Sequence, residues 1–202
     1  LRLVGSEMCI RDSYYMRFPS EMLYLWKGGL VFYGGLLGAI PACLLYCKWK
    51  KLNFSATLDL MAPALALGHA IGRIGCLGAG CCHGSSTTMP WGLRLNTDLV
   101  DPILRNMPVH PTQAYEAFFL AFLSSALCFL LLKRKYPDGV IALSYMMSYS
   151  LARTIIEIFR GDQIRGFIIN GWLSTSQFIS ILLFFICGAL LFFRVCRLAR
   201  NN

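Results

Sequence analysis

The sequence predicts an all-α integral membrane protein with five transmembrane helices. Apolar residues make up 56% of the 202 residues, charged residues make up only 14%, and five apolar stretches each approach the length of a membrane span. About 20 helical residues cross the roughly 30 Å of hydrocarbon in a bilayer. A helix is expected because a span in lipid must satisfy its own backbone hydrogen bonds. An ordinary water-soluble enzyme, with nearer a quarter of its residues charged, is excluded.

The five apolar stretches are the expected transmembrane helices, and they follow one another at 29–47, 57–75, 113–132, 139–159 and 173–193. We expect residues 14–202 to form a single transmembrane domain, with outward loops at about 76–112 and 160–172. Residues 1–13 lack apolar periodicity and are similar to leaders that recur in translated sequencing reads. We therefore expect a non-native leader there and exclude it from the fold.

Basic residues cluster after every second span, which predicts the orientation of the helices. The clusters follow the first, third and fifth spans: Lys48, Lys50 and Lys51; Lys133, Arg134 and Lys135; Arg194, Arg197 and Arg200. Loops rich in Lys and Arg stay on the cytoplasmic side, so the two longer loops are expected to face outward. The net charge of +9 then reflects topology and contact with anionic membrane lipid. No motif of the sequence indicates a nucleic-acid partner.

Ionisable residues inside the spans gather near their outward ends, where charges in lipid are costly and typical of functional sites. Four residues of the fourth span share one helical face because they are spaced by four: Tyr145, Tyr149, Arg153 and Glu157. Arg73 reaches the same depth from the second span. This pattern predicts a guanidinium site for an anionic head group, in which Glu157 holds one arginine. The alternative is an Arg153–Glu157 pair that only neutralises itself between helices.

Glycine recurs at the end of the second span and in the loop that follows: Gly68, Gly72, Gly75, Gly78, Gly80 and Gly84. We expect the first three to permit close helix packing. The last three are expected to let the backbone turn and approach a ligand. A glycine-rich loop beside an arginine is also a plausible phosphate cradle.

The same loop carries the only polar cluster of cysteines, in which Cys76, Cys81, Cys82 and His83 are spaced as C-x4-C-C-H. This spacing matches no familiar zinc pattern, so we expect small turn-forming residues and no metal. A metal site and a disulfide at the oxidising outer face are the alternatives. The cysteines within the apolar stretches are interpreted as small hydrophobic residues.

Two further residues are candidates for proton transfer. His110 begins the segment HPTQAYE, in which Pro111 suits the first turn of a helix, and a histidine can act as acid or base near neutral pH. Tyr33 is flanked by Gly34 and Gly35, which leave the backbone around its hydroxyl bare. The alternatives are a capping histidine and an interfacial aromatic anchor.

Four motifs in this order resemble the prolipoprotein diacylglyceryl transferase family, and the resemblance runs from about residue 28 to the C-terminus. They are GGLVFYGGLLG at 28–38, GRIGC at 72–76, HPTQAYE at 110–116 and YSLARTIIEIFRGD at 149–162. They look like the family patterns GG-x-x-x-(H/Y)-GG-x-x-G, GR-x-GN, HP-(T/S)-Q-x-YE and R-x-x-x-E-x-x-R, and Gln177 falls where the family has a glutamine. Family members have seven spans, so the resemblance implies an intact protein with two more spans before these five.

The resemblance implies a transferase of the bacterial inner membrane, with its active side facing the periplasm or exterior and no cofactor. The family moves a diacylglyceryl group from phosphatidylglycerol to the lipobox cysteine thiol in a prolipoprotein signal peptide, and glycerol phosphate leaves. The resemblance implies catalytic roles for Arg73 and Arg153, which would bind the phosphate. Tyr33 or His110 would be the base that generates the thiolate. The implied substrate-binding residues are Gly72, Gly75, Gly84, Gln113, Tyr149, Glu157 and Arg160.

The sequence departs from the family pattern at a few positions. Tyr33 stands where many members carry His, and polar positions of the second motif are occupied by Cys76, Ala79 and Cys81. These departures favour two alternatives, a non-catalytic protein that binds anionic phospholipid and a transferase with another acceptor. A transporter is a third alternative, but a pore needs polar groups at its inner end and the last span offers almost none.

Overall fold

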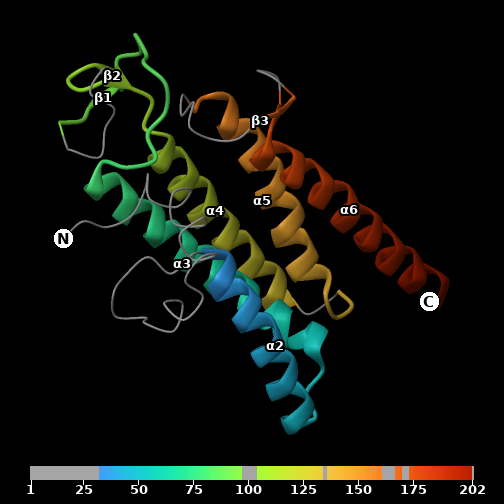
Figure 1. Ribbon diagram of the computed structural model, residues 1–202. Coiled ribbons are helices and arrows are strands. Elements are labelled where there is room, and N and C mark those ends of the chain that lie inside the picture. Colours follow the sequence, from blue (N-terminus) through green and yellow to red (C-terminus); the bar gives the residue numbers. More distant parts are fainter. Residues whose placement is uncertain (1–31, 97–103, 134–135, 161–166, 170–172, 202) are drawn as a thin grey trace.

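The computed structural model describes residues 32–96, 104–133, 136–160, 167–169 and 173–201. The expected leader, residues 1–13, lies outside this described part. Within it the chain forms five α-helices (Figure 1): α2 Phe32–Lys50, α3 Phe54–Ala79, α4 Thr112–Lys133, α5 Val140–Ile158 and α6 Thr175–Asn201. The prediction of five helices is confirmed, and most helix ends lie within four residues of the expected ends. Among the described residues, α3, α4 and the Gln177–Arg194 part of α6 are long and apolar enough to cross a membrane by themselves.

Two short antiparallel hairpins interrupt the segments 76–112 and 160–172, where only loop was expected. Strand β1, Leu93–Arg94, pairs with β2, Pro108–Val109. Strand β3, Phe167–Ile169, pairs with β4, Leu173–Ser174. Strands of two or three residues are too short to show an alternating pattern, so the sequence does not predict them. Both hairpins lie at the same end of the helix bundle (Figure 1).

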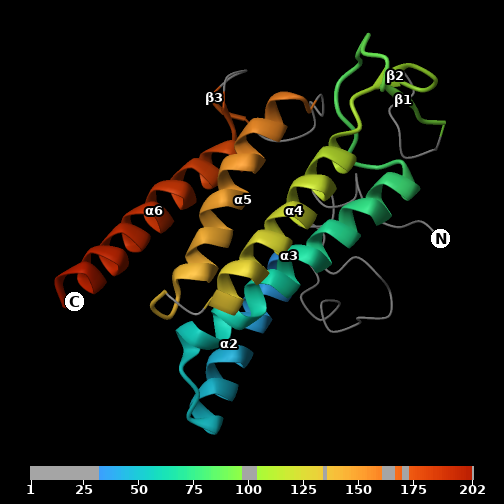
Figure 2. The ribbon, with the colours of Figure 1, turned by 180° about the vertical axis from the view of Figure 1, so that it is seen from behind.

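The helices pack side by side in the order α3, α4, α5 and α6, and α2 lies beside the beginning of α3 (Figures 1 and 2). A buried apolar cluster joins α3, α4 and α5: Ala62, Ala66, Leu123, Leu127 and Ile141. The alanines of α3 let the helices approach closely, as small residues do in membrane bundles. This cluster is the apolar core of the bundle, and the polar residues described in the next section lie on the same three helices.

Helix α4 presents large apolar side chains away from its neighbours. Phe118, Phe122 and Phe129 are 78%, 75% and 57% exposed, and their spacing places them on one face. Leu120 and Leu127 on the opposite face are fully buried. A water-soluble protein rarely exposes such a continuous apolar surface, whereas lipid solvates it. The exposed face of α4 therefore supports the prediction of a membrane-spanning helix.

Asp59 of α3 binds the beginning of α5. Its two carboxylate oxygens accept hydrogen bonds from the backbone amides of Gly139, at 2.6 Å, and Ala142, at 2.8 Å. The first amides of a helix have no partner within the helix, and a carboxylate also interacts favourably with the positive end of the helix dipole. This buried contact sets the position of α5 relative to α3, and with it the position of the polar face of α5.

Candidate functional site

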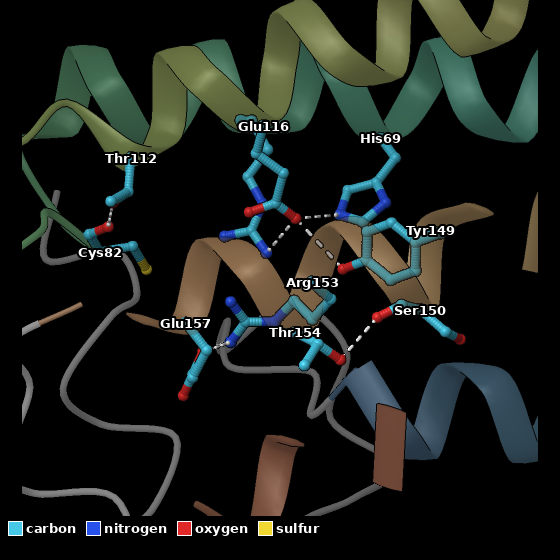
Figure 3. Close-up of polar contacts among 10 residues, drawn as sticks. His69, Cys82, Thr112, Glu116, Tyr149, Ser150, Arg153, Thr154 and Glu157 are labelled. Carbon is cyan, nitrogen blue, oxygen red and sulfur yellow. Dashed lines mark hydrogen bonds and ion pairs between the residues drawn. The ribbon is translucent and has the colours of Figure 1, made fainter. Parts of the chain in front are cut away.

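The carboxylate of Glu116 joins three helices. It is only 2% exposed, and its Oε1 atom lies 3.0 Å from Nη2 of Arg73. The hydroxyl of Tyr149 donates a hydrogen bond to the same oxygen at 3.1 Å, and Nε2 of His69 lies 3.6 Å away (Figure 3). Because α3, α4 and α5 each contribute to this contact, Glu116 holds the polar faces of the three helices together.

Helical spacing explains why these residues meet. His69 and Arg73 are four residues apart on α3 and therefore lie on one face. Tyr149 and Arg153 have the same spacing on α5, and the ring of Tyr149 lies 4.9 Å from that of His69. The predicted polar face of the fourth span is thus turned toward α3 and α4, as a charged face in lipid requires.

Arg153 and Glu157 form an ion pair within α5, with Nη2 and Oε2 2.6 Å apart (Figure 3). This contact is common to the predicted holding role of Glu157 and to the alternative of a self-neutralising pair, so that role stays a prediction. The pair does not use all of the guanidinium group, because Nη1 of Arg153 is buried without a hydrogen-bond acceptor among the described residues. Nε of Arg73 on α3 is also buried without a hydrogen-bond acceptor among the described residues. A buried donor without an acceptor costs about 1–3 kcal/mol, so an acceptor bound by these two donors would stabilise the site.

The ionised groups that the structure describes in this region are three guanidinium groups and two carboxylates: Arg73, Arg153, Arg160, Glu116 and Glu157. The side chains of Arg73 and Arg153 both lie within electrostatic range of Tyr149. The arrangement can therefore bind an anion with charge-assisted hydrogen bonds from two helices.

The loop after α3 is fixed to the beginning of α4. The hydroxyl of Thr112 donates to the carbonyl of Cys82 at 3.0 Å, and the side-chain amide of Gln113 donates to the carbonyl of Cys81 at 2.6 Å. Both side chains are buried. Gln113 was expected to bind substrate; in the structure its amide nitrogen holds this loop, and its Oε1 is buried without a partner in the described part of the chain.

Three thiols meet in this loop. The Sγ atoms of Cys76, Cys81 and Cys82 all lie within 4.8 Å of one another. Hydrogen bonds from the thiols of Cys76 and Cys81 lower the pKa of Cys82 below that of an ordinary thiol. The charges of Arg160 and Arg73 act in the same direction because they favour the thiolate. The hydrogen bond with Cys76 is the largest of the effects that raise the pKa of Cys81. The pKa of Cys82 is thus lowered, whereas the pKa of Cys81 is raised.

His110 lies in a second group of contacts, at the end of the loop between α3 and α4. Its Nδ1 is 3.3 Å from the hydroxyl of Tyr115, and its ring lies 5.5 Å from that of Phe159. Gly84 packs directly against it, since a Cβ built on Gly84 would lie 2.7 Å from the Cβ of His110 and 2.7 Å from the carbonyl oxygen of Phe159. The close backbone approach expected at Gly84 is thus an approach to the protein itself.

The glycines within α3 do not pack as expected. A Cβ built on Gly68, Gly72 or Gly75 would meet no described atom within 4 Å. The prediction of close helix packing at these positions is therefore wrong for the described part of the chain, because α3 turns its alanines toward α4 instead. The binding role of Gly72 and Gly75 stays a prediction. Tyr33 lies in α2, but its side chain lies outside the described side chains.

Sequence reasoning missed the central role of Glu116 and the participation of His69. Both residues are ionisable and lie within the predicted spans 57–75 and 113–132, but the sequence pattern assigned neither of them a role. The signal for His69 is its spacing of four residues from Arg73, which places both on one face of α3. The signal for Glu116 is weaker, because its contacts depend on how α4 is rotated against its neighbours.

Comparison with known proteins adds to this geometry. Residues 4–194 match the family model described as prolipoprotein diacylglyceryl transferase. A phosphatidylglycerol–prolipoprotein diacylglyceryl transferase of Clostridium tetani is 38% identical over 161 residues, which are 80% of this chain and 62% of the relative. One from Geobacter sulfurreducens is 34% identical over 85% of this chain and 64% of the relative. One from Ehrlichia ruminantium is 32% identical over 98% of this chain and 75% of the relative. The chain thus spans less than two thirds of the length of the first two relatives.

Proposed function

This chain belongs to the prolipoprotein diacylglyceryl transferase family, and we propose that it transfers a diacylglyceryl group from phosphatidylglycerol to the lipobox cysteine thiol of a prolipoprotein. In this reaction a carbon–sulfur bond forms at the glyceryl carbon and the bond from that carbon to the phosphate oxygen breaks. The products are the thioether-linked lipid and glycerol phosphate, and the thiol proton is taken up by a base. The names of the relatives support this substrate pair.

The observation that carries the proposal is the pair of buried guanidinium donors, Nε of Arg73 and Nη1 of Arg153, which have no acceptor among the described residues. The phosphate of phosphatidylglycerol supplies acceptor oxygens for both. As the carbon–oxygen bond breaks, negative charge grows on the leaving phosphate, and fixed positive groups stabilise it at that point. Glu116 and Glu157 would orient the two guanidinium groups through their ion pairs.

The thiol proton needs a base, because the thiolate is the nucleophile. Tyr33 and His110 remain the candidates from sequence, and the geometry adds His69. Its Nε2 lies 3.6 Å from the Glu116 carboxylate, and its side chain is 25% exposed beside Arg73. A neutral histidine can accept a proton near neutral pH. We therefore include His69 as a candidate base.

The proposed location is the bacterial inner membrane, with the site facing the exterior or periplasm. The helix ends that carry Lys50 and Lys133 lie opposite the end with the two hairpins (Figure 1). Basic residues favour the cytoplasmic side, so the hairpin end, where the arginines lie, would face outward. A secreted prolipoprotein presents its lipobox at this face of the membrane.

The test is transfer from radiolabelled phosphatidylglycerol to a lipobox peptide by the membrane-embedded full-length protein. The proposal expects a thioether-linked product, lost when the acceptor cysteine is replaced by serine and reduced by Arg73→Ala. His69→Gln tests this candidate base: if His69 takes the proton, the variant loses the acidic limb of the pH–rate profile as well as rate, whereas a residue that only positions Glu116 leaves the shape of that profile unchanged. Saturable phosphatidylglycerol binding without product, under conditions where a relative is active, would instead favour the non-catalytic lipid-binding alternative.

A further inference from the structure

We propose that Cys76, Cys81 and Cys82 form a binding site for a thiophilic metal ion, and that zinc is the ion that suits it best. The three Sγ atoms lie within 4.8 Å of one another at the outward end of α3. This inference does not depend on the proposed transferase activity, because it rests only on the donor set and its surroundings. It revises the interpretation of these cysteines as turn-forming residues.

The backbone turns twice to bring the thiols together. Gly80 ends α3 in the left-handed conformation, with φ of 73°, and its amide bonds back to the carbonyls of Cys76 and Leu77. Cys82 is also left-handed, with φ of 62°, although it has a side chain. Such a conformation is disfavoured for residues other than glycine and persists where the surroundings hold it. The two turns fold residues 81 and 82 back toward Cys76, which a regular helix end would not do.

The loop that carries the thiols is held from the outside. Thr112 and Gln113, both buried at the beginning of α4, donate hydrogen bonds to the carbonyls of Cys82 and Cys81. These bonds fix the backbone of two of the three donors before any metal arrives. Metal sites depend on such supporting hydrogen bonds, which orient the ligands and raise affinity.

The distances suit a metal better than a disulfide. Zinc binds thiolates at about 2.3 Å, which places the sulfur atoms of a tetrahedral site roughly 3.8 Å apart. Thiols already within 4.8 Å need only small side-chain movements to reach that spacing. A disulfide would use two of the three sulfur atoms and leave the third unused. The convergence of all three is explained by one central ion.

The nearby charges favour this particular kind of site. The guanidinium groups of Arg73 and Arg160 lie within electrostatic range of the thiol of Cys82. A bare divalent cation would be repelled by these arginines, but zinc bound by three thiolates carries one net negative charge. Thiolate ligands select soft ions and disfavour calcium and magnesium, which prefer oxygen. The site is therefore suited to zinc, with its fourth position taken by water or another donor.

Cobalt serves as the spectroscopic probe for zinc in the test. The full chain, reduced and solubilised in detergent, is titrated with Co²⁺ and then with Zn²⁺. We expect one equivalent of Co²⁺ to bind with a sulfur-to-cobalt charge-transfer band that Zn²⁺ abolishes. Cys76→Ser and Cys82→Ser should weaken binding by at least about tenfold. Cys128→Ser is the matched control, because Cys128 is an exposed cysteine on α4 outside the cluster, and it should bind as the parent does.

A second measurement needs no variant. Zinc should protect the three thiols from alkylation in the parent protein, as read by mass spectrometry of the peptide that contains them. The proposal is overturned if the reduced protein shows no charge-transfer band, if Cys76→Ser binds as tightly as the parent, or if zinc gives no protection. It is equally overturned if two of the thiols are joined in a disulfide as purified and take up no metal after reduction.

Discussion

Nη2 of Arg73 and Oε1 of Glu116 lie 3.0 Å apart, and this ion pair joins α3 to α4 inside the apolar bundle. Removing one partner of a buried ion pair leaves an uncompensated charge. The resulting loss of stability is larger than the net stabilisation that the intact pair provides. The same carboxylate oxygen also accepts a hydrogen bond from Tyr149 of α5. Glu116 therefore fixes the direction of a guanidinium group and the packing of a third helix at once.

Replacing this carboxylate tests its orienting role. Glu116→Gln keeps the shape but loses the charge, so Arg73 is no longer held in one direction, and transfer should fall about 100-fold in kcat/KM. Tyr149→Phe removes one neutral hydrogen bond and should cost about fivefold, the equivalent of roughly 1 kcal/mol. Both are measured as diacylglyceryl transfer to a lipobox peptide. Equal activity of Glu116→Gln and the parent would contradict the role assigned to Glu116.

Arg153 tests whether the guanidinium geometry or only the positive charge matters. Arg153→Lys keeps the charge, but a single ammonium group cannot hold Glu157 and a phosphate in the same planar arrangement. We expect a loss of about 100-fold in the rate of transfer, as for removal of one donor to a developing anion. Arg94→Lys, at an exposed position on β1, is the control and should leave the rate of transfer unchanged. Full activity of Arg153→Lys would show that charge alone suffices.

The spans and the polar face of α5 could be predicted from sequence because both depend on local pattern. The third span was expected at 113–132 and α4 covers Thr112–Lys133, since apolar length alone sets such a helix. The face shared by Tyr149, Arg153 and Glu157 follows from a spacing of four. These properties need no knowledge of neighbouring helices.

The contacts of Glu116 and of the thiols could not be predicted, because they depend on tertiary geometry. Which residues meet the Glu116 carboxylate is set by the rotation of α3 and α5 about their axes, and no sequence spacing encodes that angle. The thiols converge because Cys82 adopts a positive φ of 62°. Sequence propensity disfavours this conformation for any residue with a side chain, so the cysteine spacing alone indicated no site.

Asp59 is expected to matter for stability. Asp59→Asn keeps one acceptor for the amides of Gly139 and Ala142 but loses the charge at the beginning of α5. We expect the free energy of unfolding to fall by about 1–2 kcal/mol, in the range of a lost helix cap. The measurement is the thermal transition of the detergent-solubilised protein. Ser125→Ala is the control, because this exposed hydroxyl bonds only to its own helix. A transition unchanged by Asp59→Asn would contradict the capping role.

The lowered pKa of Cys82 predicts its pH-dependent reactivity. An ordinary thiol has a pKa of about 8.5 and loses reactivity steadily below that pH. Because the folded pKa of Cys82 lies below its ordinary value, the thiolate should persist as the pH falls. Its alkylation rate should therefore fall more slowly with decreasing pH than in the urea-unfolded chain. The rate is followed by mass spectrometry in metal-free buffer, and a pH profile identical to that of the unfolded chain would refute the assignment.

Gly84 and Gly78 form a matched pair that tests the packing of the loop between α3 and α4. A Cβ on Gly84 would lie 2.7 Å from the Cβ of His110 and 2.7 Å from the carbonyl oxygen of Phe159, whereas a Cβ on Gly78 meets no described atom within 4 Å. The atom in contact at Phe159 belongs to the backbone, which moves away less readily than the end of a flexible side chain. Gly84→Ala should therefore lower the free energy of unfolding by about 1–3 kcal/mol.

Gly78→Ala should be neutral or stabilising by up to about 1 kcal/mol, because alanine is the better residue within a helix. Thermal transitions of the two variants, measured side by side, give the comparison. The direct packing of Gly84 against His110 requires that Gly84→Ala be the less stable variant. If the two variants have the same thermal transition temperature, Gly84 does not pack against His110 as the structure has it. The contacts between His110 and Phe159 would then need another explanation.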